Sequence, residues 1–204
     1  MKSDQIAALL SPYTATAPAD TDWPRILTQL SAYLDLILKW NARVNLTAIR
    51  TPEEIVRRHF GESLFAASHL GPCAALLDFG SGAGFPGLPL QLLRPDVLVT
   101  LAESRARKAA FLHEVVRTLN LPTEIWSTRV ESMPASRQFD AVTLRAVDNM
   151  DAALQEASHR ATRQLVVLGT TSAQYPAISK DFEPQSPMPL PNSTESALLI
   201  FRRR

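Results

Sequence analysis

The sequence of 204 residues has little cysteine and no long apolar run. Its single cysteine, Cys73, excludes an internal disulfide bond and a metal site built from several cysteines. No segment approaches the roughly 20 apolar residues of a membrane-spanning helix. The apolar run at residues 6–10 is too short for the core of a signal peptide. These absences predict a soluble, cytoplasmic protein without a membrane anchor or a metal centre.

An excess of charge of either sign is also missing. The chain carries 21 basic and 20 acidic residues, a net charge of +1, so the net charge alone does not indicate a nucleic-acid partner. Lysine is scarce, because only Lys2, Lys39, Lys108 and Lys180 occur and every other basic residue is arginine. Arginine favours planar, bidentate contacts with phosphates or carboxylates. Basic residues gather at 57–59, 105–108 and 202–204.

Glycine is rare, and its distribution is uneven. The chain has seven glycines, and four of them lie in the segment DFGSGAGFPG at residues 78–87, at positions 80, 82, 84 and 87. Glycine within an ordered element costs about 0.5–1 kcal/mol relative to alanine. The cluster therefore predicts a backbone that adopts positive φ angles or closely approaches a ligand.

The pattern of apolar residues predicts an α/β fold in two parts. Residues 1–72 have helical spacing, with a capping box at 51–54, and form a predicted N-terminal extension. Residues 73–204 alternate between short apolar runs and helices, which is typical of parallel βαβ units. The predicted strands cover residues 74–79, 97–102, 124–128, 139–144, 165–168 and 197–201, and the predicted helices cover 88–93, 105–119 and 150–161.

The glycine segment follows the first predicted strand, which is where open α/β sheets bind cofactors. Residues 82–87 satisfy the G-x-G-x-x-G pattern of dinucleotide sites, which alone is a weak match. Read from Gly80, with Asp78 at the strand end, the segment suits S-adenosylmethionine, whose ammonium is positive. Asp78 would instead repel the pyrophosphate of NAD. We expect Asp78, Gly80, Gly82 and Gly84 to bind S-adenosylmethionine and Glu103 to accept its ribose hydroxyls, with an NAD-dependent oxidoreductase as the alternative.

Several further motifs accompany this segment in a fixed order. They are Lys39-Trp40-Asn41, Asn45-Leu46-Thr47, Arg58-His59, Ser63, DFGSGAGFPGLPL at 78–90, Glu103-Ser104-Arg105, Lys108, Phe111-Leu112, Arg129-Val130-Glu131 and Arg145-Ala146. In these motifs, from about residue 25 to 170, the chain resembles the ribosomal RNA small subunit methyltransferase G family, formerly glucose-inhibited division protein B.

The resemblance implies a Rossmann-like class I S-adenosylmethionine-dependent methyltransferase with an N-terminal helical extension. It implies methyl transfer to N7 of guanine 527 in 16S rRNA, either as free rRNA or within the 30S subunit. It also implies that Gly80 and Phe85 line the cofactor, that Val130 and Glu131 flank the adenine, and that Arg145 lies at the methyl-transfer end. Two segments depart from the family pattern, since no lysine occurs in 167–170 and Leu144 replaces the serine of Ser-Arg-Ala.

Methylation of guanine N7 needs neither a nucleophilic nor a basic side chain. The sequence lacks a cysteine nucleophile late in the sheet, a lysine-rich base cluster and an Asn/Asp-Pro-Pro-aromatic loop after residues 139–144. Guanine N7 attacks with an in-plane lone pair and loses no proton, so alignment of the reactants is enough. We therefore predict no general base, and Arg145 as the residue that orients the acceptor.

The basic clusters lead to a further prediction. We expect Arg57, Arg58, Arg105 and Arg107 to contact RNA phosphates, with a solvated helix face as the alternative for Arg57 and Arg58. The missing lysine also leaves open a non-catalytic RNA-binding protein that retains the methyltransferase fold.

Overall fold

The computed structural model describes residues 1–204 and contains a mixed sheet between two helical layers. The strands are β1 (Ala75–Phe79), β2 (Leu98–Ala102), β3 (Glu124–Trp126), β4 (Phe139–Arg145), β5 (Ala161–Thr170), β6 (Phe182–Pro184), β7 (Met188–Pro189) and β8 (Ser196–Arg203). The helices are α1 (Ser3–Leu10), α2 (Trp23–Val44), α3 (Pro52–Glu54), α4 (Glu62–His69), α5 (Gly87–Leu93), α6 (Ala106–Leu119) and α7 (Met150–Arg160). Shorter helical segments are η1 (Ser11–Tyr13), η2 (Ile55–Gly61) and η3 (Val130–Ser132).

The strand order is β3-β2-β1-β4-β5-β8-β6, with β7 also paired to β8. Strands β1 to β5 are parallel, whereas β8 runs antiparallel to β5. The chain moves outward from β1 through β2 to β3 and then returns to place β4 on the other side of β1. The order therefore reverses beside β1, and the carboxyl ends of β1 and β4 form the topological switch point at which such sheets bind ligands.

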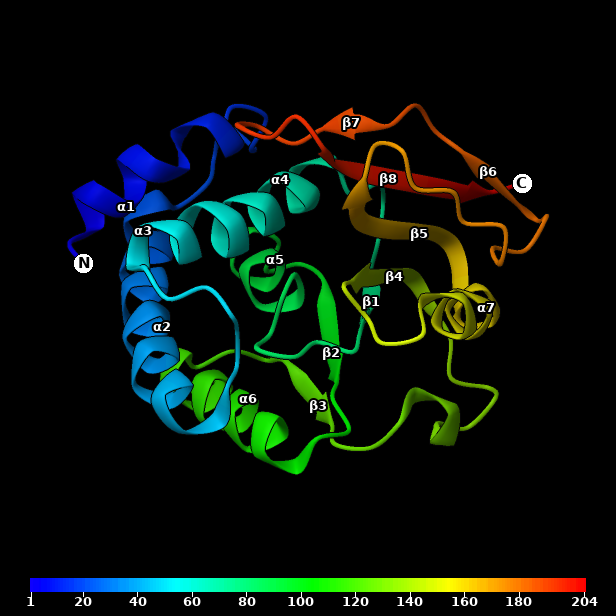
Figure 1. Ribbon diagram of the computed structural model, residues 1–204, viewed down its shortest axis with the longest axis horizontal. Coiled ribbons are helices and arrows are strands. Elements are labelled where there is room, and N and C mark those ends of the chain that lie inside the picture. Colours follow the sequence, from blue (N-terminus) through cyan, green and yellow to red (C-terminus); the bar gives the residue numbers. More distant parts are fainter.

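Each face of the sheet has its own core. Side chains alternate along β1, so Leu76 packs with the helices α1, α2, α4, α5 and α6, whereas Leu77 packs on the side of α7. Figure 1 shows the larger group of helices on one side of the sheet and α7 on the other. No helix of this fold combines the length and apolar character that a membrane crossing requires.

The long helix α2 follows from local sequence signals. Asp22 accepts a hydrogen bond from the backbone N–H of Arg25 at 3.2 Å, and Pro24 occupies the first turn. Ile26, Leu30 and other apolar residues at helical spacing are fully buried. The helix ends at Asn45, which adopts a left-handed conformation with a φ of 36°.

The predicted strands and helices of residues 73–204 are confirmed within a few residues, but three features were not anticipated. The strand β5 is longer than expected, and the connection after Gly169 contains β6 and β7. In the N-terminal part, the helical segment that follows the predicted capping box at 51–54 includes the π-helical turn η2. The division into an extension and a domain at residues 72 and 73 stays a prediction. One core cluster joins α1 and α2 to β1 and β2.

Candidate functional site

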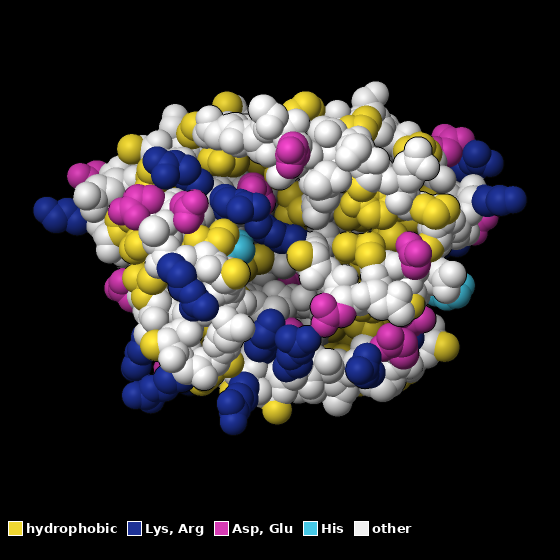
Figure 2. Space-filling view, viewed as in Figure 1, with side chains coloured by type: hydrophobic (Ala, Val, Ile, Leu, Met, Phe, Trp, Pro, Cys, Tyr) yellow, Lys and Arg dark blue, Asp and Glu magenta, His cyan; other side chains and the backbone are white.

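A cavity of about 850 Å³ opens at the carboxyl ends of β1, β2 and β4. Its size is within the range of small-molecule and cofactor sites. Figure 2 shows a hollow in this face of the molecule, with Lys and Arg side chains on its rims. The predicted residues in the cavity wall are Gly80, Gly82, Phe85, Glu103, Arg105, Val130, Glu131 and Arg145, and the wall also includes Leu46, Thr47, His59, Lys108, Arg129 and Val147.

The glycine turn serves the cavity at two positions. Gly80, Gly82 and Gly84 have φ angles of 69°, 59° and 92°, which confirms the expected left-handed backbone. Gly80 and Gly82 line the cavity. A Cβ atom at Gly82 would meet no protein atom closer than 3.9 Å, so within the protein itself this position requires glycine only for its backbone angles.

The other two glycines face the protein core. A Cβ atom at Gly84 would overlap the Leu88 side chain and lie 2.6 Å from Tyr33 Oη, while one at Gly87 would lie 2.8 Å from Asp78 Oδ2. Gly84 does not line the cavity. A side chain at Gly84 would therefore meet α2 and α5, and the contact of its backbone with the cofactor stays a prediction.

Asp78 lies at the end of β1, as predicted, and its side chain contacts the turn. Its side chain is fully buried beneath the turn, where Oδ2 accepts a hydrogen bond from the Gly87 N–H at 3.0 Å and Oδ1 accepts one from Thr143 Oγ1 at 2.8 Å. Burial raises the pKa of Asp78 to about 6, although these hydrogen bonds oppose the shift. Asp78 is absent from the cavity wall and anchors the turn through these bonds, and its contact with a ligand's ammonium stays a prediction.

Glu103 joins β2 to the glycine turn at the cavity wall. Its Oε2 accepts a hydrogen bond from the Gly82 N–H at 3.0 Å, and its Oε1 accepts one from the Arg105 N–H at 2.7 Å. The residue is only 6% exposed. These two bonds fix the carboxylate in one orientation, and each oxygen keeps a further lone pair for a hydroxyl donor.

The remaining predicted wall residues come from opposite sides of the cavity. Val130 and Glu131 lie on η3, Val130 buried and Glu131 exposed. Phe85 follows the glycine turn and stacks on His59, with ring centroids 4.6 Å apart. The geometry therefore surrounds the cavity with a glycine turn, a carboxylate, an apolar wall and an aromatic pair. Their roles toward a ligand stay predictions.

Arg145 lies at the end of β4, as predicted, but its partner was not anticipated. Its Nη2 is 2.8 Å from Oε2 of Glu62, the first residue of α4. The Arg145 and Glu62 side chains are 14% and 9% exposed. Burial lowers the pKa of Arg145 and raises that of Glu62, and the attraction between the two charges opposes both shifts. The pair depends on the π-helical turn before Glu62, which apolar periodicity does not reveal.

Asn41 and Trp40, from the family motif, have structural contacts. Asn41 Oδ1 accepts a hydrogen bond from the Thr47 N–H at 3.0 Å, and its Nδ2 donates to the Thr47 carbonyl at 3.1 Å. Trp40 packs edge-on against Phe111. Asn41 thereby holds the loop that brings Leu46 and Thr47 to the cavity wall.

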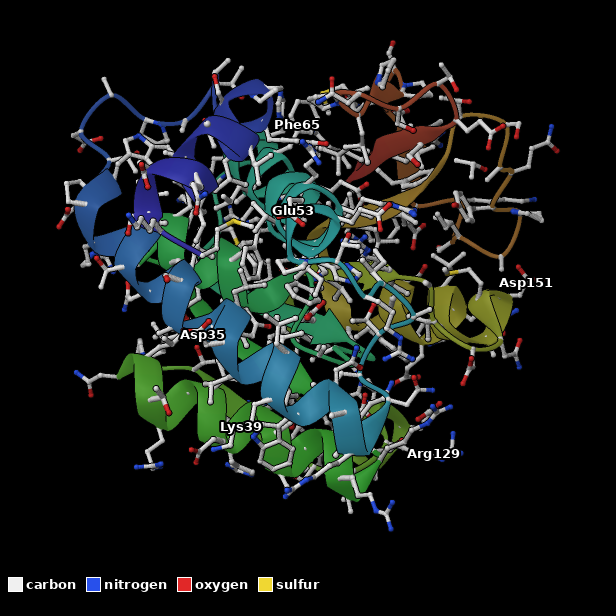
Figure 3. All side chains as sticks on the ribbon, turned by 60° about the vertical axis from the view of Figure 1, so that its left-hand side comes forward. Asp35, Lys39, Glu53, Phe65, Arg129 and Asp151 are labelled. Carbon is white, nitrogen blue, oxygen red and sulfur yellow. The ribbon has the colours of Figure 1, made fainter.

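The four arginines predicted to contact RNA are all exposed. Arg105 forms an ion pair with Asp148 at 2.8 Å, and Arg58 lies 3.9 Å from Glu62. Arg57 and Arg107 form no ion pair with the protein. Only Arg105 lines the cavity, while Arg58 and Arg107 directly precede the wall residues His59 and Lys108. Figure 3 shows a further basic residue, Arg129, at the periphery of the molecule.

Comparison with known proteins gives a consistent result. The family model described as rRNA small subunit methyltransferase G matches residues 26–177. A protein of Nitrosomonas europaea named Ribosomal RNA small subunit methyltransferase G is 40% identical over 140 residues, which are 68% of this chain and 64% of that protein. A protein of the same name from Pseudomonas paraeruginosa is 36% identical over 183 residues, 86% of each chain. The chain spans 55% to 64% of the length of the first three such relatives.

Solved structures show the same fold at low sequence identity. The N-methyltransferase NodS from Bradyrhizobium japonicum, in complex with S-adenosyl-L-homocysteine, has a TM-score of 0.58 at 12% identity, covering 81% of this chain and 98% of that chain. TYW2 from Pyrococcus horikoshii has a TM-score of 0.57 at 14% identity, covering 71% and 62%. The fold is therefore the Rossmann-like α/β fold of class I methyltransferases, as the sequence indicated.

Proposed function

The chain belongs to the rRNA small subunit methyltransferase G family, and we propose that it transfers a methyl group from S-adenosylmethionine to N7 of a guanine in 16S rRNA. We further propose that the position is guanine 527 and that the reaction takes place in the cytoplasm. The observation that carries the proposal is the cavity at the switch point, lined by Gly80, Gly82 and Glu103 within the segment that matches the family.

The cavity wall fits S-adenosylmethionine, which supplies an electrophilic methyl group on a sulfonium when it is bound. Gly80 and Gly82 present their backbone without a Cβ atom. The oriented carboxylate of Glu103 accepts hydrogen bonds from the ribose hydroxyls. Val130 and Glu131 bound the adenine side, and Phe85 closes the side toward His59.

For this reaction the chain has to hold the two reactants in the correct orientation. Guanine N7 carries a free in-plane lone pair, so no group has to remove a proton before it attacks. Catalysis by positioning reaches large effective concentrations when reacting atoms are held in line. Arg145 at the cavity wall donates hydrogen bonds to the acceptor base or a neighbouring phosphate while N7 stays free. Residues 1–72 serve as an extension that supplies the acceptor side of the cavity.

The direct test is transfer of labelled methyl to unmodified 16S rRNA and to unmodified 30S subunits, followed by mapping of the modified base. We expect one guanine to be methylated at N7. Thermal unfolding with S-adenosylhomocysteine and with NADH separates the remaining alternatives. Stabilisation by NADH alone would favour an oxidoreductase, and stabilisation by S-adenosylhomocysteine without methyl transfer would favour a non-catalytic RNA-binding protein.

Replacing Glu103 by alanine is expected to weaken binding of S-adenosylhomocysteine by about ten- to a hundredfold. The change removes a charged acceptor, which typically contributes about 1.5–3 kcal/mol. Isothermal titration calorimetry measures the affinity. The matched control is Asp151→Ala, which removes an exposed carboxylate of α7 outside the cavity wall (Figure 3). Equal affinities for the parent and Glu103→Ala proteins would disprove the ribose assignment.

Replacing Arg57 and Arg107 together by alanine is expected to flatten the salt dependence of RNA binding. Each phosphate contact that is lost lowers the slope of log binding constant against log salt concentration by about 0.7–0.9, because fewer counterions are released. Filter binding of 16S rRNA at several salt concentrations measures the slope. The control pair is Arg163→Ala with Arg202→Ala. Arg163 lies near the start of β5 and Arg202 pairs with Gln164, at the edge of the sheet opposite the cavity. An unchanged slope in the first pair contradicts the phosphate assignment.

A further inference from the structure

A buried ion pair crosses from the N-terminal helices to the sheet at the cavity wall. Glu62 begins α4 directly after the π-helical turn η2, and its carboxylate meets Arg145 at the end of β4. Such pairs are costly to desolvate and often add no net stability over apolar residues of similar volume. π-helical turns are frequent at functional sites. The pair therefore indicates a need for a fixed arginine at this point.

Two buried nitrogen atoms at this wall have no hydrogen-bond partner within the protein. They are Nη1 of Arg145 and Nδ1 of His59, and both residues line the cavity. A buried polar atom without a partner costs free energy, so native structures rarely keep one without a function. Because Glu62 binds Nη2 of Arg145, Nη1 remains available for a ligand.

His59 forms a hydrogen bond with Thr47 through its Nε2 atom. Thr47 Oγ1 accepts a hydrogen bond from the Ile49 N–H at 3.1 Å and lies 2.7 Å from His59 Nε2. In one of the two neutral tautomers of His59 the threonine hydroxyl donates to Nε2, and the ring proton lies on Nδ1. Burial and the neighbouring Arg145 and Arg58 lower the pKa of His59 to about 3. The ring is therefore neutral at physiological pH, and in the tautomer with Thr47 as the donor its Nδ1–H is free to donate to a ligand.

We propose that Glu62 is a positioning residue that holds Arg145 so that its Nη1 and His59 Nδ1 donate hydrogen bonds together to the O6 carbonyl of the methyl-accepting guanine. This inference rests on the proposed function and extends it to base selection. Guanine presents O6 as an acceptor beside N7, whereas adenine presents an amino donor at the same place. Two donors therefore accept a 6-oxopurine and reject adenine, and they leave the N7 lone pair free for the methyl group.

The first test separates positioning from folding. Glu62→Gln keeps the side-chain shape and removes the charge that holds Arg145. We expect the single-turnover rate at saturating 30S subunits to fall about 10- to 100-fold, the loss that a displaced positioning group produces. Affinity for S-adenosylhomocysteine and the midpoint of RNA binding are expected to stay within about twofold of the parent values. The control is Glu53→Gln, an exposed carboxylate at the start of the same helical segment (Figure 3).

The second test does not depend on methyl transfer. In protein with ¹⁵N-labelled histidine saturated with S-adenosylhomocysteine, guanosine monophosphate is expected to shift the His59 Nδ1 resonance, and adenosine monophosphate is not. The shift is expected to weaken in Glu62→Gln and to persist in Glu53→Gln.

Different results would contradict the donor-pair proposal and the proposed function. Equal responses to the two nucleotides, or a Glu62→Gln enzyme with the parent rate, would overturn the donor-pair proposal even if the parent methylates 16S rRNA. A guanosine-specific shift in a parent protein without methyl transfer would support the donor pair and contradict the proposed function.

Discussion

Replacing Arg145 by methionine is expected to lower the single-turnover rate of rRNA methylation by about a hundredfold or more, the effect that loss of one preorganised donor typically has. The guanidinium lies at the carboxyl edge of β4 and lines the cavity. It acts after the RNA has bound, so RNA affinity is expected to change little. Affinity for S-adenosylhomocysteine is expected to fall only modestly. Rapid-quench single-turnover assays and calorimetry measure these quantities.

The same substitution also carries a large cost in stability. Without Arg145, the nearly buried carboxylate of Glu62 keeps only Arg58, 3.9 Å away, as an ionic partner. Breaking a buried pair from one side typically costs about 3–5 kcal/mol of the free energy of unfolding. The double variant Glu62→Gln with Arg145→Met removes both charges and is expected to recover most of that loss.

The double variant is the decisive control for Arg145. If the arginine only stabilises the fold, the double variant recovers the methylation rate together with its stability. If Arg145 orients the acceptor, the double variant regains stability in urea unfolding and remains slow. Recovery of the parent rate in the double variant would contradict the orienting role.

Local signals were enough to predict most of the fold and the end of the sheet at which the cavity lies. The strands around Leu76 and Leu101, and the glycine turn between β1 and α5, follow from short apolar runs and residue types whose effects are local. Arg145 could be placed at the cavity because it directly follows a predicted strand, and the carboxyl ends of parallel strands meet at one edge.

Sequence reasoning did not reach side-chain orientation and long-range partners. Asp78 and Gly84 lie in the predicted segment, but the direction in which each faces depends on Thr143, Tyr33 and Leu88, which belong to other elements. The pairing of Glu62 with Arg145 joins residues 83 positions apart (145 − 62). Its geometry depends on a π-helical turn, whose extra residue per turn is not visible in a pattern of period 3.6.

Substitutions at the different glycines of the turn are expected to have different effects on cofactor affinity and on stability. Replacing Gly82 by valine is expected to reduce affinity for S-adenosylhomocysteine by at least a hundredfold in a protein that still folds. Gly82 has a φ of 59° and lines the cavity. A left-handed backbone costs a residue with a Cβ atom about 1–2 kcal/mol, and the branched side chain occupies the ligand's space. Calorimetry measures the affinity, and circular dichroism checks the fold.

Replacing Gly84 by alanine, two residues further on, is expected to lower the stability of the protein and to leave its affinity for S-adenosylhomocysteine nearly unchanged. A Cβ atom there meets Tyr33 Oη at 2.6 Å and overlaps Leu88, at a φ of 92°. Strain of the backbone and overpacking of the core together cost roughly 2–5 kcal/mol, which lowers the unfolding temperature of a chain of this size by about 10 °C. The fraction that remains folded at 10 °C is expected to bind S-adenosylhomocysteine with near-parental affinity, because Gly84 does not line the cavity. If Gly84→Ala instead abolishes binding at unchanged stability, the turn meets the cofactor at Gly84 and the division of the glycines between cavity and core is wrong.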